Sequence, residues 1–234
     1  MSDSAQNNTV ARRENPLLSL LLNIVVPAII LMRFSNDEWL GPVNGLLVAL
    51  AFPLAYGIID FSLRRTFNFL PVVGIVGILL TGGIGLLKLD PMWIAVKEGA
   101  IPLLIGIAVL GSLKTRFSLL SMLLNQVIDS EAVDTALDDR GTRAAYEKRL
   151  VHATYIVAAS FFLSSVLNYI LARLVVVSQP GTTAFNEELG KMTALSFPVI
   201  SVPAIIILSI AIIYTAVGIR SLTGIELERI FRQR

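Results

Sequence analysis

Cysteine is absent from this 234-residue sequence, and His152 is its only histidine. Without cysteine the chain can form no disulfide, no thiolate nucleophile and no thiolate metal site. One histidine cannot build a histidine-based metal cluster, so neither a metal nor another cofactor is expected. Charge is also scarce, since Asp, Glu, Lys and Arg make up 15% of the residues, against about 25% in soluble domains. The net charge of +2 is too small to favour nucleic acid as a partner.

Long apolar runs take the place of the missing charge. Hydrophobic residues make up 55% of the chain, and the mean hydropathy is +0.74. Six segments approach the ~20 residues that a helix needs to cross a bilayer. They cover residues 16–32, 40–59, 69–87, 92–113, 154–177 and 193–219. The sequence therefore predicts an all-α polytopic membrane protein, with six transmembrane helices in one membrane domain (16–219) and the lipid bilayer as its partner.

Basic residues are distributed unevenly between the two sides of these segments. Fourteen lie in the N-terminal tail (1–15), after the second and fourth segments, and in the C-terminal tail (220–234). The alternate loops hold only Arg33, Lys88 and Lys191. Because cytoplasmic loops carry the excess of Lys and Arg, both termini and the long loop 114–153 are predicted to face the cytoplasm.

The long loop 114–153 contains three predicted pieces. Phe117–Ile128 is an amphipathic run suited to lying in the membrane interface. Ser130 is predicted to cap a short helix over 131–138, Gly141 to end it, and Thr142 to cap the helix that enters the fifth segment. A solvated connector held by basic residues is the simpler interpretation, and a surface that docks a partner is the alternative.

The arrangement of three spans followed by three is compatible with an inverted repeat, a common plan among transporters. Pro27 follows Asn23 by four residues, and Pro102 follows Glu98 by four residues. Proline lacks the N–H that would bond the carbonyl four residues earlier, so it kinks a helix and frees that carbonyl. In both halves the freed carbonyl would belong to a polar residue.

Charged residues inside the fourth and fifth segments are the main candidates for a functional site, because an ionisable group within a membrane span is costly. The ~1.5 Å helical rise places Lys97 and Glu98 roughly 8–9 Å below the outer surface and Arg173 about 6 Å below it. One interpretation is an ion pair between Glu98 and Arg173 that joins the two helices. The other is an outward-facing polar pocket, in which Glu98 accepts a proton or cation and Lys97 and Arg173 bind an anion.

Other polar and small residues are weaker candidates. Asn44 lies at a similar depth, whereas Asn168 lies deeper and is more often an interhelical hydrogen bond than a ligand site. Gly82 and Gly83 favour close helix packing, with an unwound turn as the alternative. Residues 185–188, Phe-Asn-Glu-Glu, are predicted to lie in an outer loop as a cap or lid over the pocket.

The order of several features resembles the bacterial intracellular septation protein A family and its six-span relatives. The shared features are Gly82-Gly83, Asp90, Lys97, Ser112, Lys114–Arg116, Asn168, Phe185-Asn186 and Ala194-Leu195. The likeness covers about residues 70–195, while the longer cytoplasmic loop, Glu98 and Arg173 depart from it. The resemblance implies a bacterial inner (plasma) membrane protein linked to septation and cell-envelope maintenance, with membrane or envelope proteins as partners.

Two functions follow as expectations. The first is an envelope protein that acts through membrane partners or lipid, and the alternative is a small transporter or ion-coupled carrier that uses Lys97, Glu98 and Arg173. Enzymatic activity is not expected, because no nucleophile–base pair is visible in the sequence.

Overall fold

The computed structural model describes residues 21–64, 69–114 and 130–225. The elements are, in order, η1 (Leu21–Val25), α2 (Val26–Arg33), α3 (Gly41–Arg64), α4 (Phe69–Leu86), α5 (Met92–Ser112), α7 (Ser130–Asp139), α8 (Arg143–Val175), α9 (Thr183–Ser196), η2 (Phe197–Ser201) and α10 (Val202–Thr223). All of them are helical, which confirms the predicted all-α class for this part of the chain. The predicted tail 1–15, the amphipathic run 117–128 and residues 226–234 lie outside the described residues.

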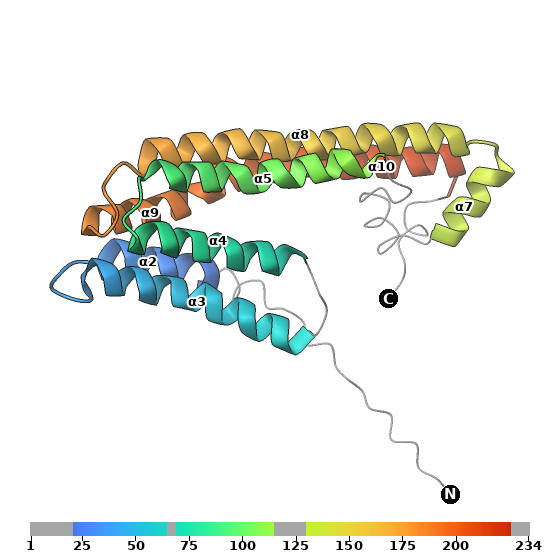
Figure 1. Cartoon of the computed structure of the whole chain (residues 1–234). Coiled ribbons are helices and arrows are strands. Elements are labelled where there is room, and N and C mark those ends of the chain that lie inside the picture. The colour runs from blue at the N-terminus through green and yellow to red at the C-terminus, as the bar shows by residue number, and fades with distance from the viewer. Residues whose placement is uncertain (1–20, 65–68, 115–129, 226–234) are drawn as a thin grey trace, which may run out of the picture.

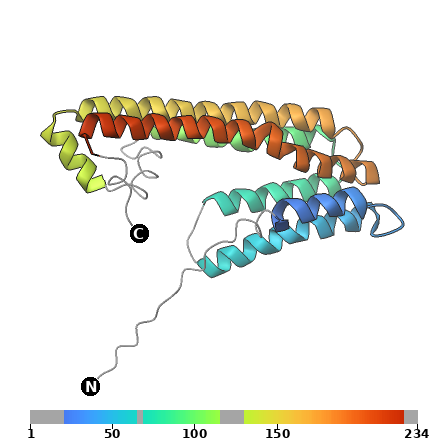
Figure 2. The same ribbon diagram turned by 180° about the vertical axis from the view of Figure 1, so that it is seen from behind.

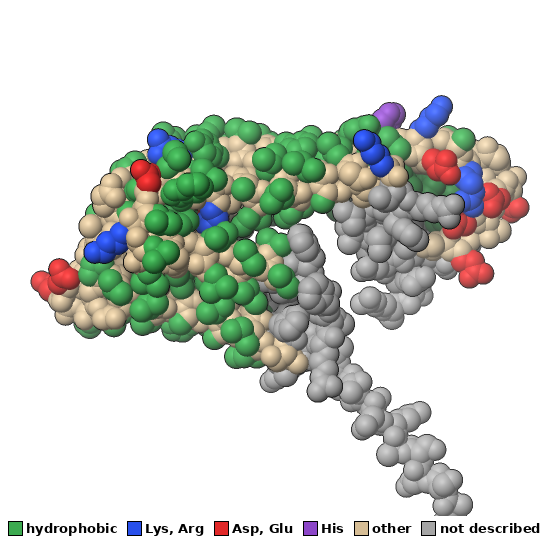
Figure 3. Space-filling view, in the orientation of Figure 1, with side chains coloured by type: hydrophobic (Ala, Val, Ile, Leu, Met, Phe, Trp, Pro, Cys, Tyr) green, Lys and Arg blue, Asp and Glu red, His purple; other side chains and the backbone are tan. Residues whose placement is uncertain are grey.

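Four helices are long and apolar enough to cross a membrane: α3, α5, α8, and the continuous helix formed by α9, η2 and α10. Leu21–Arg33 and Val72–Leu86 are shorter apolar helices. Helix α8 begins at Arg143, as predicted, whereas the last long helix begins at Thr183, earlier than the predicted segment 193–219, because helical structure extends from the apolar run into polar sequence. Apolar side chains are spread over the helices on the face that Figure 3 shows, and Leu104 and Leu174 are 64% and 75% exposed.

The helices form two groups that meet at one end and diverge toward the other (Figure 1 and Figure 2). Helices α5, α8 and α10 run side by side in one group, whereas α2, α3 and α4 form the other. Loops 34–40, 87–91 and 176–182 lie at the meeting end, where α9 packs against α2. Helix α7 lies at the diverging end of the first group. The two groups differ in helix length, and the inverted repeat stays a prediction.

A hydrophobic core closes the meeting end. Phe185 and Ile94 are completely buried there, and Leu46, Ile84 and Val176 pack in the same cluster. These residues come from α3, α4, α5 and α9 and from the loop after α8, so the core joins the two groups where their loops gather.

Helix α9 is part of this core, which corrects the predicted lid. Residues 185–188 lie inside a helix rather than in a loop, and Phe185 and Asn186 are buried. The Asn186 side-chain amide donates a hydrogen bond to the Pro42 carbonyl at 2.7 Å. The Glu188 carboxylate accepts hydrogen bonds from the backbone N–H groups of Val177 and Ser178 at 2.9 and 2.8 Å. The segment therefore holds α9 against α3 and against the loop after α8.

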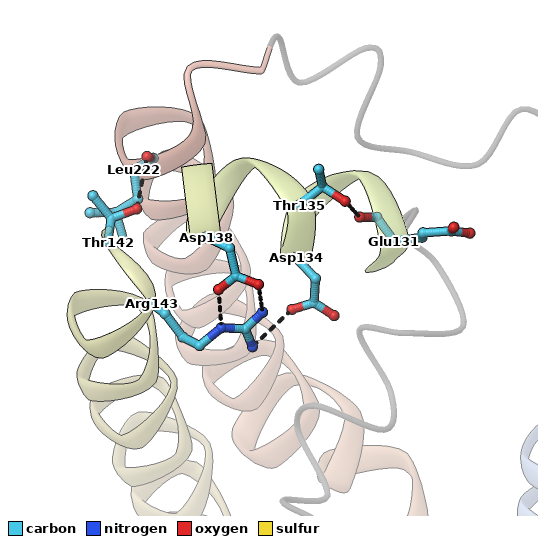
Figure 4. Close-up of polar contacts among 7 residues, drawn as sticks. All are labelled: Glu131, Asp134, Thr135, Asp138, Thr142, Arg143 and Leu222. Carbon is cyan, nitrogen blue, oxygen red and sulfur yellow. Dashed lines mark hydrogen bonds and ion pairs between the residues drawn. The ribbon is translucent and has the colours of Figure 1, made fainter. Parts of the chain in front are cut away.

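Helix α7 is fixed to the end of α10 at the diverging end. Val133 and Leu137 are buried against Ile219. Figure 4 shows Arg143 paired with Asp138, at 2.6 Å from Nε to Oδ1, and with Asp134. The hydrogen bond from Arg143 lowers the pKa of Asp138 below its ordinary value of 3.8. The predicted short helix and the break at Gly141, where φ is +63°, are present.

The two predicted caps of this region are wrong. The Thr142 hydroxyl donates to the Leu222 carbonyl of α10 at 3.1 Å (Figure 4) instead of capping α8. The Ser130 hydroxyl oxygen is buried and forms no hydrogen bond to a described residue. The Thr142 contact runs to a helix 80 residues away, so no local pattern could predict it.

Candidate functional site

Lys97 and Glu98 form an ion pair in the first half of α5. The Lys97 ammonium lies 2.6 Å from Glu98 Oε1, and the two side chains are 8% and 26% exposed. The Lys97 side chain is therefore buried beside Glu98, although it is long enough to extend its ammonium to the protein surface. A buried ammonium bonded to a half-buried carboxylate sits within an otherwise apolar helix.

The predicted ion pair between Glu98 and Arg173 is not formed. Arg173 is exposed and makes no ion pair with any described residue, whereas Glu98 bonds to its neighbour in sequence. The depth estimate placed the three side chains at one level, but depth does not determine the direction in which a residue points around the helix axis. Arg173 is not among the residues that line the cavity beside the pair.

The ion pair does not join two helices, because both residues belong to α5. Helix α5 is held against α8 by close backbone packing instead. A Cβ atom at Gly99 would lie 3.1 Å from Tyr169 Cβ, and one at Gly106 would lie 3.1 Å from the Phe162 ring. The Ser165 hydroxyl also donates to the Gly99 carbonyl at 2.7 Å. Since these contacts fasten the two helices, the Lys97–Glu98 pair is not needed as a joint.

A cavity of about 590 Å³ lies against the ion pair. Its wall is formed by η1 and by helices α2, α3, α4, α5 and α9, and is mainly apolar. The polar side chains in the wall are Asn23, Tyr56, Thr81, Lys97, Glu98 and Thr193. A cleft of this volume, with a few convergent polar groups in an apolar wall, has the size and composition of a small-molecule site.

The cavity extends away from the meeting end, and the prediction that the pocket faces outward stays a prediction. Tyr56 and Gly57 of α3 line it, as do Val73 and Gly74 of α4, and these residues lie in the helix halves remote from loops 34–40 and 87–91. The buried core lies on the loop side. The buried core therefore bounds the cavity on the side of these loops.

Asn44 and Asn168, the two predicted amide candidates, are not part of this cavity. Asn44 is exposed and donates to the Leu40 carbonyl at 3.0 Å. Asn168 donates to the Ser164 carbonyl of its own helix at 2.8 Å, rather than to a neighbouring helix. Both amides bond within their own chain segment and contribute no group to the site.

The two predicted prolines lie close to the site. Pro27 lines the cavity and follows the π-helical turn η1, which carries the cavity residue Asn23. Pro102 lies inside α5, four residues after Glu98, and supplies no N–H to the Glu98 carbonyl. Wide π-helical turns often occur at functional sites, so the Asn23–Pro27 spacing marks part of the cavity wall.

Gly82 and Gly83 differ in their surroundings. A Cβ atom at Gly82 would lie 3.1 Å from Leu50 Cδ1, as expected for close packing, whereas one at Gly83 would meet nothing within 4 Å. Helix α4 continues to Leu86, so the alternative of an unwound turn at these glycines is wrong.

Sequence reasoning missed Tyr56 and Thr193 as wall residues and Asn186 as a buried crosslink. Tyr56 and Thr193 lie on separate helices, so no spacing along the chain connects them with Lys97. Asn186 carried no such signal either, because Glu187 and Glu188 follow it and make this stretch look like a solvated loop.

Together the fold and the site define an all-helical protein with four potential membrane spans and a cavity bordered by a buried ion pair. Within residues 21–64, 69–114 and 130–225, no three acidic or histidine side chains are grouped to hold a metal ion. Comparison with protein-family models, with curated proteins and with solved structures gave no match.

Proposed function

We propose that the chain is a six-span protein of the bacterial inner membrane, with both termini in the cytoplasm. The two shorter apolar helices, together with the four long ones, support six spans, because the described part of each predicted segment overlaps one of these helices. The excess of basic residues in the tails and in loop 114–153 supports the orientation.

Within this topology, the protein acts as a small carrier for an amphiphilic molecule. The observation behind this proposal is the Lys97–Glu98 pair at the wall of the 590 Å³ cavity. Burying two charges costs more than an apolar wall would, and this pair fastens no second helix. Ligand binding would explain why two charged residues occur in this apolar wall. With the proposed orientation, the buried core bounds the cavity on the outer side and the lining residues Tyr56 and Gly74 lie on the cytoplasmic side, which is the arrangement expected of one state of an alternating-access carrier.

Single-cysteine labelling tests the carrier, because the chain has no cysteine of its own. Thr81→Cys places a thiol in the cavity, and a charged, membrane-impermeant thiol reagent is applied to inside-out and right-side-out vesicles. If the protein is a carrier, the Thr81→Cys thiol reacts with the reagent from both sides of the membrane, and faster from the cytoplasmic side. Leu104→Cys, which points outward from α5, is the control and reacts slowly from either side. Reaction of Thr81→Cys from the cytoplasmic side alone would identify a static pocket and refute the carrier.

The envelope role implied by the septation resemblance is a second candidate. It is supported by α7, which is fixed to α10 by Val133 and Leu137 and presents Glu131 and Asp139 on an exposed surface. In a deletion strain with an envelope or septation defect, this role predicts that Glu131→Lys/Asp139→Lys fails to restore the normal phenotype. Gly74→Trp, which fills the cavity, would still restore it. The reverse pattern would favour the carrier.

A further inference from the structure

The hydrogen-bonding capacity of the ion pair is only partly used. A lysine ammonium has three N–H donors, and Lys97 uses one of them on Glu98 Oε1. No described residue accepts from the other two, although the side chain is 8% exposed. A buried donor without an acceptor is costly. Lys97 therefore needs oxygen acceptors supplied from the cavity.

Glu98 has the complementary requirement. Its Oε1 atom is bonded to Lys97, and its Oε2 atom accepts no hydrogen bond from a described residue. The side chain is 26% exposed and lines the cavity. Free N–H donors and a free carboxylate oxygen thus lie side by side at one place in the wall.

The charge of this place restricts the ligand. Lys97 and Glu98 together are neutral, so a ligand with a single charge would leave one charge uncompensated in an apolar cavity, which is unfavourable. A zwitterion compensates both groups. Its anionic oxygens bond to the Lys97 ammonium, and its cationic group lies against Glu98 Oε2. Because Oε2 lacks a donor, an ammonium with N–H groups fits better than a quaternary ammonium.

The remainder of the cavity accommodates an apolar body. From Lys97 the wall continues past Ile101 and Ile78 to Gly74 and Gly57, without a further charged residue among those that line it. At Gly74 a Cβ atom would meet nothing within 4 Å, so this part of the cavity is open. A polar headgroup at the ion pair would direct an apolar chain toward Gly74.

We propose that the cavity binds an amphiphile with a phosphoethanolamine-type headgroup, whose phosphate bonds to Lys97 and whose primary ammonium bonds to Glu98. The inference rests on the proposed carrier function and names the class of molecule carried. Both a membrane phospholipid and a soluble molecule can supply this headgroup.

Native mass spectrometry of the purified full-length protein tests the headgroup. The protein is titrated with phosphatidylethanolamine, phosphatidylcholine and phosphatidylglycerol of identical acyl chains. The ethanolamine lipid is expected to bind about ten-fold more tightly than either other lipid, the factor expected for one charge-assisted hydrogen bond. Equal binding of the three lipids would overturn the proposal.

Variants connect this preference with the ion pair. Glu98→Gln leaves Lys97 as an uncompensated cation, so the preference shifts from phosphatidylethanolamine to the anionic phosphatidylglycerol. Arg173→Gln, outside the cavity, leaves the preference unchanged. The readout is a ratio between lipids on the folded protein, so lower stability of a variant does not imitate the shift. An unchanged ratio in Glu98→Gln would refute the role of the pair.

Two further comparisons distinguish a membrane lipid from a soluble ligand, and the headgroup inference from the carrier proposal. Glycerophosphoethanolamine, which has the headgroup without acyl chains, displaces bound lipid only at much higher concentration if a bilayer lipid is the ligand. If glycerophosphoethanolamine displaces the lipid at a concentration equal to that of the lipid, a soluble molecule with the same headgroup is the ligand. If no ethanolamine compound binds but Thr81→Cys reacts from both sides, the carrier stands and this inference fails. Selective binding with one-sided labelling supports the inference and refutes the carrier.

Discussion

Lys97 and Glu98 are adjacent in sequence, so their side chains leave α5 about 100° apart. The lysine side chain is long enough to turn back and place its ammonium 2.6 Å from the carboxylate. Within one helix such a bond adds nothing to helix association, but it keeps two opposite charges together in an apolar wall. The pair is thus a preformed polar site. Its burial lowers the stability of the fold, and packing elsewhere in the protein offsets this loss.

Removing one or both members of the pair should have opposite effects on stability. Glu98→Leu leaves the Lys97 ammonium without its partner and should reduce the free energy of unfolding by about 1–3 kcal/mol. The double variant Lys97→Met/Glu98→Leu removes both charges and should be at least as stable as the parent, since apolar replacement of a buried pair is often neutral or stabilising. Thermal unfolding in detergent measures both. A double variant less stable than Glu98→Leu alone would contradict this account.

At the scale of helices, α9 is the element that closes the meeting end. Its N-terminal half contributes Phe185 to the core, Asn186 to α3, and Glu188 to the loop after α8. A hydrogen bond from a fully buried amide is expensive to lose, because the carbonyl that accepted it is then left without that donor. The seal consequently depends on a few polar contacts as well as on apolar packing.

Asn186→Leu should weaken this seal. The substitution removes the amide that donates to the Pro42 carbonyl at 2.7 Å, and the free energy of unfolding should fall by about 1–3 kcal/mol. Asn44→Leu is the matched control, because Asn44 is exposed and bonds within its own segment, and its effect should stay within about 0.5 kcal/mol. Chemical denaturation in mixed micelles compares them. Equal losses in the two variants would show that the Asn186 contact does not hold α9 in place.

The contact between α7 and α8 should depend on pH. The Arg143 hydrogen bond lowers the pKa of Asp138 in the folded protein below 3.8, so its stabilising contribution is present above pH 3.8 and is lost as the pH falls through the lowered value. Carboxyl NMR of Asp138 should therefore titrate below its ordinary range, and Arg143→Gln should raise the pKa. An Asp138 midpoint that is the same with and without Arg143 would disprove the pairing in solution.

At the scale of the whole molecule, the sequence predicted most of the described helices, but not the helical segment Thr183–Ser196, nor how the helices are rotated or tilted. Apolar runs gave the positions of the helices, because the ~20-residue requirement acts on each segment separately. The partner of Glu98 was mistaken because rotation about the helix axis depends on contacts such as those of Gly99 and Gly106 with α8. The cavity and the side toward which it extends depend on the divergence of the two groups, which no single segment encodes.

The orientation of the whole molecule yields the last prediction. Asp139 and Gln179 are exposed at opposite ends of α8, beyond its first and last residues, so one thiol at each position reports one side of the membrane. The basic residues of loop 114–153 predict that Asp139→Cys reacts with an impermeant reagent only in inside-out vesicles, and Gln179→Cys only in right-side-out vesicles. Both substitutions are at exposed sites, so protein yield should stay unchanged. Labelling of Asp139→Cys from the periplasmic side would reverse the orientation, and the cavity, bounded by the buried core on the side of loops 34–40, 87–91 and 176–182, would then face the periplasm.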